Sequence, residues 1–369
     1  MKKPRIGVLG SGQLGQMMAE VTLRHEIPMV SYSPDIESPM SHLGVKVIEG
    51  EFDDTDRILQ FLSQIDILTF EFENIPSRTL QFLNESQNTN SVLIYPPPNA
   101  LLIAQDRLLE KNHFQSLGFK TPQYYHLTSA NRSPQIEFPL IVKTIRFGYD
   151  GKGQSQIKNE NEWQSFLGFA FSNPESEYIV EEKIQFQKEA SVILTRFVDG
   201  SIYDYGVVEN QHKNHILDLS IFPADIDKTL AKKMQSIAHT LANSLEYIGT
   251  MGVEFFLTEN EVYLNEFAPR PHNSGHFSQD CGSISQFKLH ILAILGEKPK
   301  LPLHPNPTLM KNILGNDYEH SISIANKLLA DERYELHLYG KKIAKQGRKM
   351  GHMNFKGKLD EVSELFFEL

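Results

Sequence analysis

Apolar positions near the amino terminus alternate between short compact runs and runs at helical spacing. Residues 5–9, 28–33 and 65–72 read as short strands. Between them, residues 16–25 and 55–63 carry apolar side chains three or four positions apart, which predicts amphipathic helices. Strands that alternate with helices in this way predict an α/β fold with a parallel sheet and right-handed crossovers.

Two proline-rich stretches divide the rest of the chain. Residues 96–98 are all proline and cannot continue a helix or a central strand, so they mark the end of a first domain. Residues 101–117 predict a helix that opens a second, strand-rich domain, whose longest polar loop is 144–156. Four prolines between residues 298 and 307 precede short strands and turns. The predicted domains are therefore 1–98, 99–296 and 297–369.

Composition narrows the class of protein. The chain has 369 residues, of which 40% are hydrophobic, enough for two or three buried cores. Its formal net charge of -10 argues against a broad nucleic-acid-binding surface. The single cysteine, Cys281, cannot form an intrachain disulfide, and a cytoplasmic protein fits best. No apolar run approaches the roughly 18 residues of a spanning helix or the length of a signal peptide, so we expect no membrane segment.

The first glycine loop allows two interpretations. Residues 10–15 match Gly-x-Gly-x-x-Gly between a predicted strand and a predicted helix, and Asp35 follows at a distance that suits a ribose contact. This context is typical of NAD or flavin binding. However, the N–H groups at a helix amino terminus can donate to any anion, and glycines also serve a tight turn between strand and helix.

A lysine precedes a second glycine loop. Lys143 ends a short apolar run, and Gly148, Gly151 and Gly153 follow it. The ammonium group then lies near backbone amides that can close over phosphate oxygens. In a Walker A loop the lysine follows the glycines, so the order here favours a mobile lid over a nucleotide. A solvated turn with incidental lysines is the alternative.

Two glutamates are expected to face each other. Residues 252–257 and 261–267 predict a hairpin whose loop centres on Asn260, with Glu254 opposite Glu266. Carboxylates paired in this way, with Cβ atoms about 5 Å apart, repel unless a cation or proton intervenes. Magnesium binds through one or two carboxylates plus substrate phosphates, so the pair predicts a magnesium–nucleotide site. Two exposed surface glutamates are the alternative.

Hydrogen-bond donors concentrate in two later segments. The first segment follows the second carboxylate strand and contains Arg270, His272, Asn273 and Ser274. These side chains suit a bound anion. The second segment is a basic, glycine-flanked patch with Lys341 and Arg348, which suits a substrate phosphate. Rigid polar turns are the alternative for both segments.

An ordered set of segments closely resembles the N5-carboxyaminoimidazole ribonucleotide synthetase family, ATP-grasp ligases of purine biosynthesis. The segments are GSGQLGQM, TFEFENIP, AQDR, IVKTIRFGYDGKGQ, residues 181–189, GVEFF, LNEFAPRPHNSGH and GRKMGH. The resemblance implies an α/β protein, α+β overall, with a Rossmann-like domain, a central ATP-grasp domain and a small carboxyl-terminal domain. It also implies a homodimer that uses ATP and bicarbonate to carboxylate 5-aminoimidazole ribonucleotide through carboxyphosphate.

The resemblance also implies the ligand contacts. ATP would be held by Arg107, Lys143, Gly148, Tyr149, Asp150, Gly151, Lys152, Gly153, Gln154, Glu181, Glu182, Lys183, Ile184, Glu189, His212, Asn265 and Glu266. Mg²⁺ would be carried by Glu254 and Glu266. Strand alternation points Asn265 to the other face of the sheet, so its part in metal binding stays open.

The remaining implied contacts concern the two smaller substrates. The aminoimidazole ribonucleotide would touch Glu73, Tyr149, Lys152, Lys341 and Arg348. Bicarbonate and the carboxyphosphate made from it would be held by Arg270 and His272, with Asn273 and Ser274 beside them. The catalytic groups would be Arg270, His272 and Lys143.

Ile145 and Phe147 depart from the commonest family pattern, in which arginine and glycine are frequent, and this departure bears on lid mobility more than on the chemistry. The nearest alternative is another ATP-grasp ligase, one that carboxylates biotin or activates formate. The segments FENIP and PHNSGH favour the imidazole substrate. A dinucleotide-dependent oxidoreductase leaves the carboxylate pair unexplained, and a nucleotide-binding regulator without chemistry is the third alternative.

Overall fold

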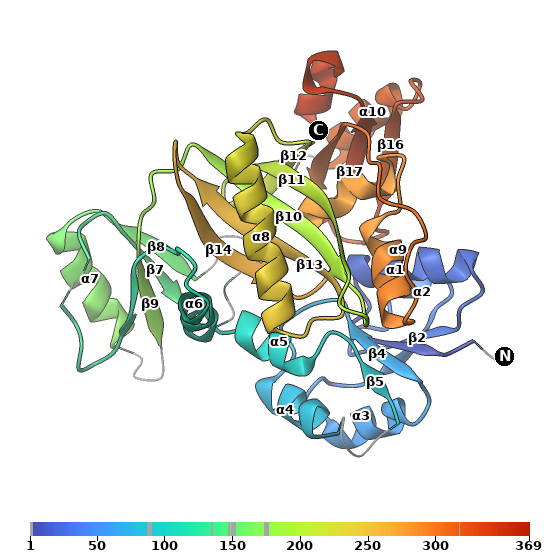
Figure 1. Ribbon diagram of the computed structural model, residues 1–369, viewed down its shortest axis with the longest axis horizontal. Helices are drawn as coiled ribbons and strands as arrows, with labels where there is room; N and C mark the ends of the chain where they lie inside the picture. The colour runs from blue at the N-terminus through green and yellow to red at the C-terminus, as the bar shows by residue number, and fades with distance from the viewer. Residues whose placement is uncertain are drawn as a thin grey trace.

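Three β-sheets with helices packed against them build the molecule (Figure 1). The computed structural model describes residues 3–86, 91–133, 136–146, 148, 153–172, 177–316 and 318–369. Helices and strands are mixed along this part of the chain, so the predicted α/β class, α+β overall, is confirmed.

The first sheet is parallel, with the strand order β3-β2-β1-β4-β5. Its strands are β1 (Ile6–Leu9), β2 (Met29–Ser33), β3 (Lys46–Glu49), β4 (Ile67–Phe70) and β5 (Leu93–Ile94). Its helices are α1 (Gln13–Arg24), α2 (Pro39–His42), α3 (Thr55–Leu62) and α4 (Ser77–Ser86). Every residue of β1 is buried, because α3 and α4 cover one face of the sheet and α1 covers the other. The predicted parallel α/β organisation is confirmed.

The predicted single helix over residues 101–117 is wrong, because the segment forms two helices. These are α5 (Pro98–Ala104) and α6 (Arg107–Ser116). Asp106 separates them, since its carboxylate accepts from the backbone N–H groups of Leu108 at 3.1 Å and Leu109 at 3.0 Å. This N-cap satisfies donors that a continuous helix would bond to its own carbonyls.

A small antiparallel sheet carries the phosphate-handling segment, at the left of Figure 1. Its order is β6-β9-β7-β8, with β6 (Tyr124–Leu127), β7 (Leu140–Thr144), β8 (Gln154–Ile157) and β9 (Tyr178–Glu182). Helix α7 (Glu160–Ala170) buries Trp163 against it. The predicted lid joins β7 to β8, so its two ends belong to paired strands.

The largest sheet has eight strands and spans the centre and the carboxyl-terminal part of the chain. Its order is β14-β13-β10-β11-β12-β15-β17-β16. The strands are β10 (Lys188–Arg196), β11 (Ile202–Lys213), β12 (Ile216–Phe222), β13 (Gly249–Leu257), β14 (Val262–Ala268), β15 (Thr308–Leu314), β16 (Tyr334–Leu338) and β17 (Lys349–Lys356). Because β12 pairs with β15, the carboxyl-terminal strands extend the central sheet.

Helices cover both faces of this sheet. Its helices are α8 (Lys228–Ser244), α9 (Gln286–Ile294) and α10 (Tyr318–Leu328), and its 3-10 turns are η1 (Asn273–Gln279), η2 (Leu359–Glu361) and η3 (Glu364–Glu368). Helix α8 crosses the face that is toward the viewer in Figure 1. Helix α9 also packs on α1 of the first sheet through Phe287, Ile291 and Met18. This shared core joins the amino-terminal sheet to the strands that carry the two glutamates.

Candidate active site

A cavity of about 1300 Å³ opens where the three sheets meet. The predicted site residues that line it are Glu73, Arg107, Lys143, Gly148, Gln154, Glu181, Glu182, Lys183, Ile184, Glu189, His212, Glu254, Asn265, Glu266, Arg270, His272, Asn273, Lys341 and Arg348. Gly153 and Ser274 lie outside the lining. Tyr149, Asp150, Gly151, Lys152 and the unusual Phe147 fall outside the described residues. Sequence motifs far apart in the chain therefore meet in one space.

Glu254 and Glu266 lie directly opposite each other in β13 and β14, so the predicted register is confirmed. Immediately beside them the register shifts, because Asn265 is an extra residue with no opposing partner. Such a β-bulge interrupts the strict alternation of side chains. As a result, Asn265 and Glu266 both line the cavity. The buried Asn265 Oδ1 atom has no hydrogen-bond partner among the described residues, so it is available to a ligand.

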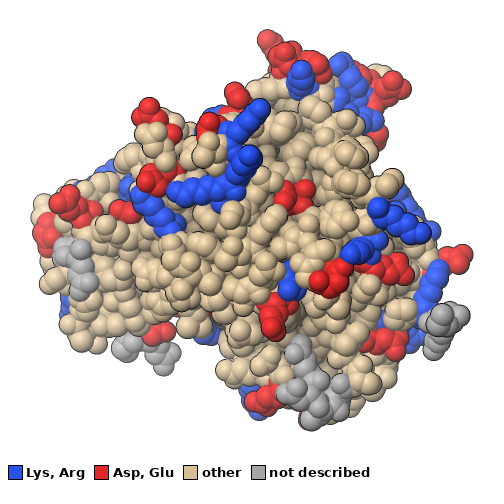
Figure 2. All heavy atoms as spheres, viewed as in Figure 1, with Lys and Arg blue, Asp and Glu red and all other residues tan. Residues whose placement is uncertain are grey.

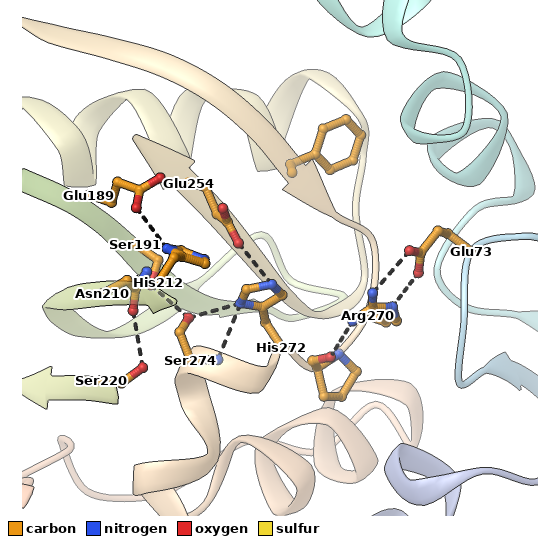
Figure 3. A network of polar contacts seen from close by, with 12 residues as sticks. Glu73, Glu189, Ser191, Asn210, His212, Ser220, Glu254, Arg270, His272 and Ser274 are labelled. Carbon is orange, nitrogen blue, oxygen red and sulfur yellow. Dashed lines mark hydrogen bonds and ion pairs between the residues drawn. The ribbon is translucent and has the colours of Figure 1, made fainter. Parts of the chain in front are cut away.

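The two glutamates differ in their electrostatics. His272 Nε2 lies 3.0 Å from Glu254 Oε1 (Figure 3). Burial alone would raise the pKa of Glu254, but His272, His212 and Lys349 together outweigh it and the pKa falls to about 2. Glu266 opens onto the cavity, yet partial desolvation by the surrounding protein and the facing Glu254 raise its pKa. A cation between the two groups would relieve this repulsion.

The donor set suits magnesium. In the described part of the chain, no cluster of three or more His, Cys, Asp or Glu side chains makes a self-sufficient metal site. Glu254, Glu266 and the unpartnered Asn265 Oδ1 supply oxygen donors only. Magnesium prefers oxygen and usually completes its shell with water and substrate phosphates, so these three residues fit a nucleotide-bound Mg²⁺.

Two lysines converge on Glu181 at the end of β9. Lys143 Nζ donates to Glu181 Oε2 at 2.7 Å, and Lys111 Nζ lies 3.9 Å from Glu181 Oε1. Burial would raise the pKa of Glu181, but Lys111 and Lys143 hold it at about 2. Lys111 also donates to the Asn265 carbonyl at 2.6 Å. It therefore ties the bulge to the small sheet and adds positive charge where phosphates would lie.

Sequence reasoning missed both Lys111 and its neighbour Glu110. Glu110 lines the cavity, and its Oε1 accepts from the Phe267 N–H at 2.9 Å. Burial, opposed by Lys111 and reinforced by Glu266, raises the pKa of Glu110 to about 8. Adjacent acidic and basic residues are ordinary in a surface helix, so the sequence carries no signal that this pair is buried.

Arg107 holds the beginning of the lid. Its Nη1 donates to the Thr144 carbonyl at 3.1 Å, and its Nη2 donates to the Gly148 carbonyl at 3.0 Å. At the other end of the lid, Gly153 has φ +74°, and a Cβ there would lie 2.6 Å from Thr144 Oγ1. Gly153 therefore serves the turn itself, whereas Arg107 and Gly148 line the cavity. Arg107 thus links α6 to the lid.

Glu189 and His212 form a second acid–base pair beside the carboxylates. His212 Nδ1 lies 2.7 Å from Glu189 Oε2 (Figure 3). Burial by itself would lower the pKa of His212, but Glu189 dominates and the pKa is raised. The pair joins β10 to β11 on the wall of the cavity.

Arg270 and Glu73 connect the central sheet to the amino-terminal domain. Arg270 Nε and Nη2 both donate to the Glu73 carboxylate, the latter at 3.0 Å (Figure 3). Burial would raise the pKa of Glu73, but Arg270 lowers it. Across the cavity, Lys341 Nζ donates to Gln13 Oε1 and, at 2.7 Å, to the Lys349 carbonyl. The two predicted anion segments therefore face one space.

Ser274 and Asn273 are adjacent, but they differ in their hydrogen bonding and in their position relative to the cavity. Ser274 is fully buried, and its hydroxyl bonds to His272 Nδ1 at 2.8 Å and to Ser191 Oγ at 2.7 Å. A buried network continues from Ser191 to Asn210 (Figure 3). Ser274 therefore orients His272 from outside the cavity lining. Both polar atoms of the Asn273 amide are buried without partners among the described residues, and Asn273 lines the cavity.

The amino-terminal glycine loop receives a carboxylate from its own chain. Glu71 Oε1 accepts from the Gly12 N–H at 2.7 Å, and Glu71 Oε2 accepts from the Gly15 N–H at 3.3 Å. A Cβ at Gly12 would lie 2.6 Å from Glu71 Oε1. A dinucleotide pyrophosphate would occupy this position at the helix amino terminus. The dinucleotide interpretation therefore loses its anion site, and the glycines are explained by close approach of Glu71.

Family models and relatives match the whole architecture. The ribonucleotide synthetase preATP-grasp domain matches residues 1–105, the ATP-grasp domain matches 112–287, and the phosphoribosylaminoimidazole carboxylase C-terminal domain matches 308–364. An N5-carboxyaminoimidazole ribonucleotide synthase from Staphylococcus aureus (strain COL) is 38% identical over 354 residues, covering 94% of this chain and 91% of that protein. The relative of the same name from Bacillus subtilis (strain 168) is 36% identical, covering 95% and 90%. The chain belongs to the N5-carboxyaminoimidazole ribonucleotide synthetase family.

Solved structures of this family superimpose on the chain. An ADP complex of an N5-carboxyaminoimidazole ribonucleotide synthetase has a TM-score of 0.90 at 35% identity, covering 100% of this chain and 97% of that one. The Aspergillus clavatus N5-carboxyaminoimidazole synthase in complex with ADP and 5-aminoimidazole ribonucleotide has a TM-score of 0.86 at 26% identity, covering 99% and 96%. The predicted family and the three kinds of domain are thus confirmed, whereas the boundaries at residues 98 and 296 stay predictions.

The surface adds little to this assignment. Acidic and basic side chains are interspersed over the face drawn in Figure 2. Among the described helices, none combines the length and hydropathy that a membrane crossing requires.

Proposed function

We propose that this synthetase-family member carboxylates 5-aminoimidazole ribonucleotide to N5-carboxyaminoimidazole ribonucleotide, consuming ATP and bicarbonate and releasing ADP and phosphate. One observation carries the proposal: a single cavity brings the Glu254–Glu266 pair together with Arg270, His272 and Lys341. Relatives named N5-carboxyaminoimidazole ribonucleotide synthase match over nearly the whole chain, and one solved relative is a complex with ADP and 5-aminoimidazole ribonucleotide.

ATP would lie along the small sheet. Ile184 and the stacked rings of Phe186 and Phe256, with centroids 4.8 Å apart, offer an apolar surface for the adenine beside the hinge 181–184. Lys143 and Arg107 lie on the same wall and would neutralise phosphate oxygens. The remaining proposed ATP contacts are Gly148, Gln154, Glu189 and His212, with Tyr149, Asp150, Gly151, Lys152 and Gly153 in the lid.

Mg²⁺ would be held by Glu254 and Glu266, with Asn265 Oδ1 as a third oxygen donor. When bound, the ion would neutralise phosphate charge during phosphoryl transfer. His272 is bonded to Glu254 and belongs to the predicted anion segment, residues 270–276, which we call the anion loop. It would therefore link the metal position to bicarbonate.

The reaction would proceed in two displacements. A bicarbonate oxygen attacks the γ-phosphorus, the bond to ADP breaks, and carboxyphosphate forms between Arg270 and His272. The exocyclic amine of the ribonucleotide then attacks the carboxyl carbon, releasing phosphate and losing a proton. Arg270 and His272 act by holding the anion in place and by stabilising its charge. Exclusion of water protects carboxyphosphate from decomposition before the amine arrives.

The ribonucleotide would span the space between the amino-terminal and carboxyl-terminal parts of the cavity. Lys341 and Arg348 would contact its phosphate, and Glu73 would contact its ring or ribose. Two further parts of the proposal follow the family resemblance alone: a cytoplasmic location and a homodimer, which light scattering after gel filtration tests.

The deciding measurement is ADP release by the purified protein with Mg-ATP and bicarbonate, with and without 5-aminoimidazole ribonucleotide. Strong stimulation by the ribonucleotide, together with incorporation of labelled bicarbonate into an acid-labile product, is the expected result. Slow release that is indifferent to the ribonucleotide would refute the acceptor. Replacing the ribonucleotide with free imidazole or with biotin controls for acceptor specificity.

A further inference from the structure

Gln286 is a buried amide directly behind the anion loop. It is the first residue of α9 and is 0% exposed. Its backbone N–H donates to Ser278 Oγ at 3.0 Å, and its carbonyl accepts from Thr250 Oγ1 at 3.0 Å. The backbone of Gln286 is therefore fixed against both η1 and β13. A buried amide side chain is expensive to keep unless its polar atoms are bonded.

The side chain of Gln286 holds the backbone of His272 on both sides. Gln286 Oε1 accepts from the His272 N–H at 2.9 Å, and Nε2 donates to the His272 carbonyl at 2.8 Å. The same Nε2 donates to His276 Nδ1 at 3.0 Å. Only the oxygen can accept from an N–H, so these bonds fix the orientation of the amide, and both of its N–H donors are used.

The loop is packed directly on this amide. A Cβ at Gly275 would lie 2.6 Å from Gln286 Oε1, and a Cβ at Gly252 would lie 2.6 Å from His272 Cβ. His272 is therefore confined between β13 and Gln286. From that position its ring reaches Glu254 at 3.0 Å. Any shift of the His272 backbone would move the ring relative to the carboxylate pair and relative to Arg270.

We propose that Gln286 is a positioning residue for the bicarbonate half of the reaction, with His276 as the acceptor that holds its amide in orientation. This inference rests on the proposed function. Gln286 does not line the cavity and so acts through His272. By fixing His272, it keeps carboxyphosphate where the amine can capture it, and its loss lets the intermediate decompose in water.

The direct test is Gln286→Met, which keeps a side chain of similar length and removes three hydrogen bonds. We expect kcat/KM for bicarbonate to fall about 10²-fold, as for a small misplacement of a reacting group. The ADP formed per molecule of carboxylated product should rise clearly above the wild-type ratio. The KM for ATP should change little, because the lysines and the hinge belong to other elements.

Asn312→Leu is the control for losing a buried amide elsewhere. Asn312 is 1% exposed, donates to the Leu217 carbonyl at 2.8 Å, and does not line the cavity. This bond joins β15 to β12 and includes no residue of the anion loop, so losing it should lower stability while the ratio of ADP to product stays at the wild-type value. A changed ratio in Asn312→Leu would show that uncoupling follows general destabilisation and would overturn the inference.

Two less disruptive variants, both at His276, test the inference if Gln286→Met does not fold. His276→Asn retains an acceptor near the position of Nδ1, whereas His276→Leu removes it. We expect the leucine variant to be uncoupled and the asparagine variant to resemble wild type. Equal coupling in the two variants, or a folded Gln286→Met with normal bicarbonate kinetics, would overturn the inference. A wild-type protein without ribonucleotide-stimulated ADP release would instead refute the proposed function, and the inference with it.

Discussion

The substitution Glu266→Gln distinguishes the effect of the facing carboxylates on stability from their role in turnover. Glu254 and Glu266 are opposite in register, with Cβ atoms about 5 Å apart. For scale, two unit charges about 5 Å apart repel by about 3 kcal/mol at the effective dielectric constant of a protein and by about 1 kcal/mol in water. Because Glu266 opens onto the cavity, water screens the pair and the lower value applies. The variant should therefore stabilise the ligand-free protein by about 1 kcal/mol.

The same change should nearly abolish turnover. Glutamine has the shape of glutamate but no charge, so the proposed Mg²⁺ site loses one of its two anionic ligands. We expect kcat to fall at least about 10²-fold, comparable to the loss of one charge-stabilising group in other active sites. The assays are ribonucleotide-stimulated ADP release and thermal unfolding with and without Mg-ADP. Mg-ADP should stabilise the wild type more than the variant.

The pH dependence of the effect has a definite sign. The pKa of Glu266 is raised from its ordinary 4.5 by partial desolvation and by Glu254. An acid with a raised pKa in the folded state costs no stability below pH 4.5, and the cost grows as pH rises through its folded pKa. The advantage of the variant should therefore appear above pH 4.5 and reach its full size once the pH exceeds the folded pKa of Glu266.

Glu259→Gln is the matched control, since Glu259 is exposed in the loop of the same hairpin. It should leave both stability and turnover unchanged. A Glu266→Gln variant that is less stable than wild type without ligand, or that turns over normally, would refute the reasoning about this pair.

Three further predictions follow from other contacts. Glu181, held at a pKa of about 2 by Lys111 and Lys143 although burial opposes them, stabilises the protein above pH 4.5 and loses this effect as pH falls toward 2. The free energy of unfolding, measured with urea, should therefore fall less at acid pH in Glu181→Gln than in the wild type. An equal pH dependence in the two proteins would contradict the lowered pKa of Glu181. Lys341→Ala should raise the KM for the ribonucleotide about 10- to 100-fold and leave the KM for ATP unchanged, as measured by steady-state kinetics. A change confined to the KM for ATP would contradict this prediction. Asn265→Ala should keep the melting temperature but raise the Mg²⁺ concentration for half-maximal rate, because Asn265 Oδ1 has no partner among the described residues; an unchanged Mg²⁺ requirement would remove it from the metal site.

The sequence alone was sufficient for features that depend on local periodicity and turn chemistry. The alternation of strands and helices predicted the parallel amino-terminal sheet, and the hairpin pattern predicted Glu254 opposite Glu266. In both cases a short stretch of chain specifies its own geometry. The order of the motifs along the chain was enough to indicate the family.

Reasoning from periodicity failed where a capping side chain, a single extra residue or a contact from a distant residue overrode the repeating pattern. Asp106 caps α6 and splits the predicted helix. Asn265 forms a bulge, so alternation assigned it to the wrong face. Glu71 fills the glycine loop from the end of another strand, which a pattern that matches dinucleotide sites cannot reveal.

Only the tertiary structure decided which charged groups are buried and what they bond. Lys111 reaches the carbonyl of Asn265, and Arg270 pairs with Glu73 across two domains. These pairs are separated by more than a hundred residues, so no spacing rule relates them. Their protonation depends on desolvation and on neighbouring charge, both of which exist only once the sheets have packed together. The sequence by itself determined the elements and the types of chemical group, and the packing decided how those groups act on one another.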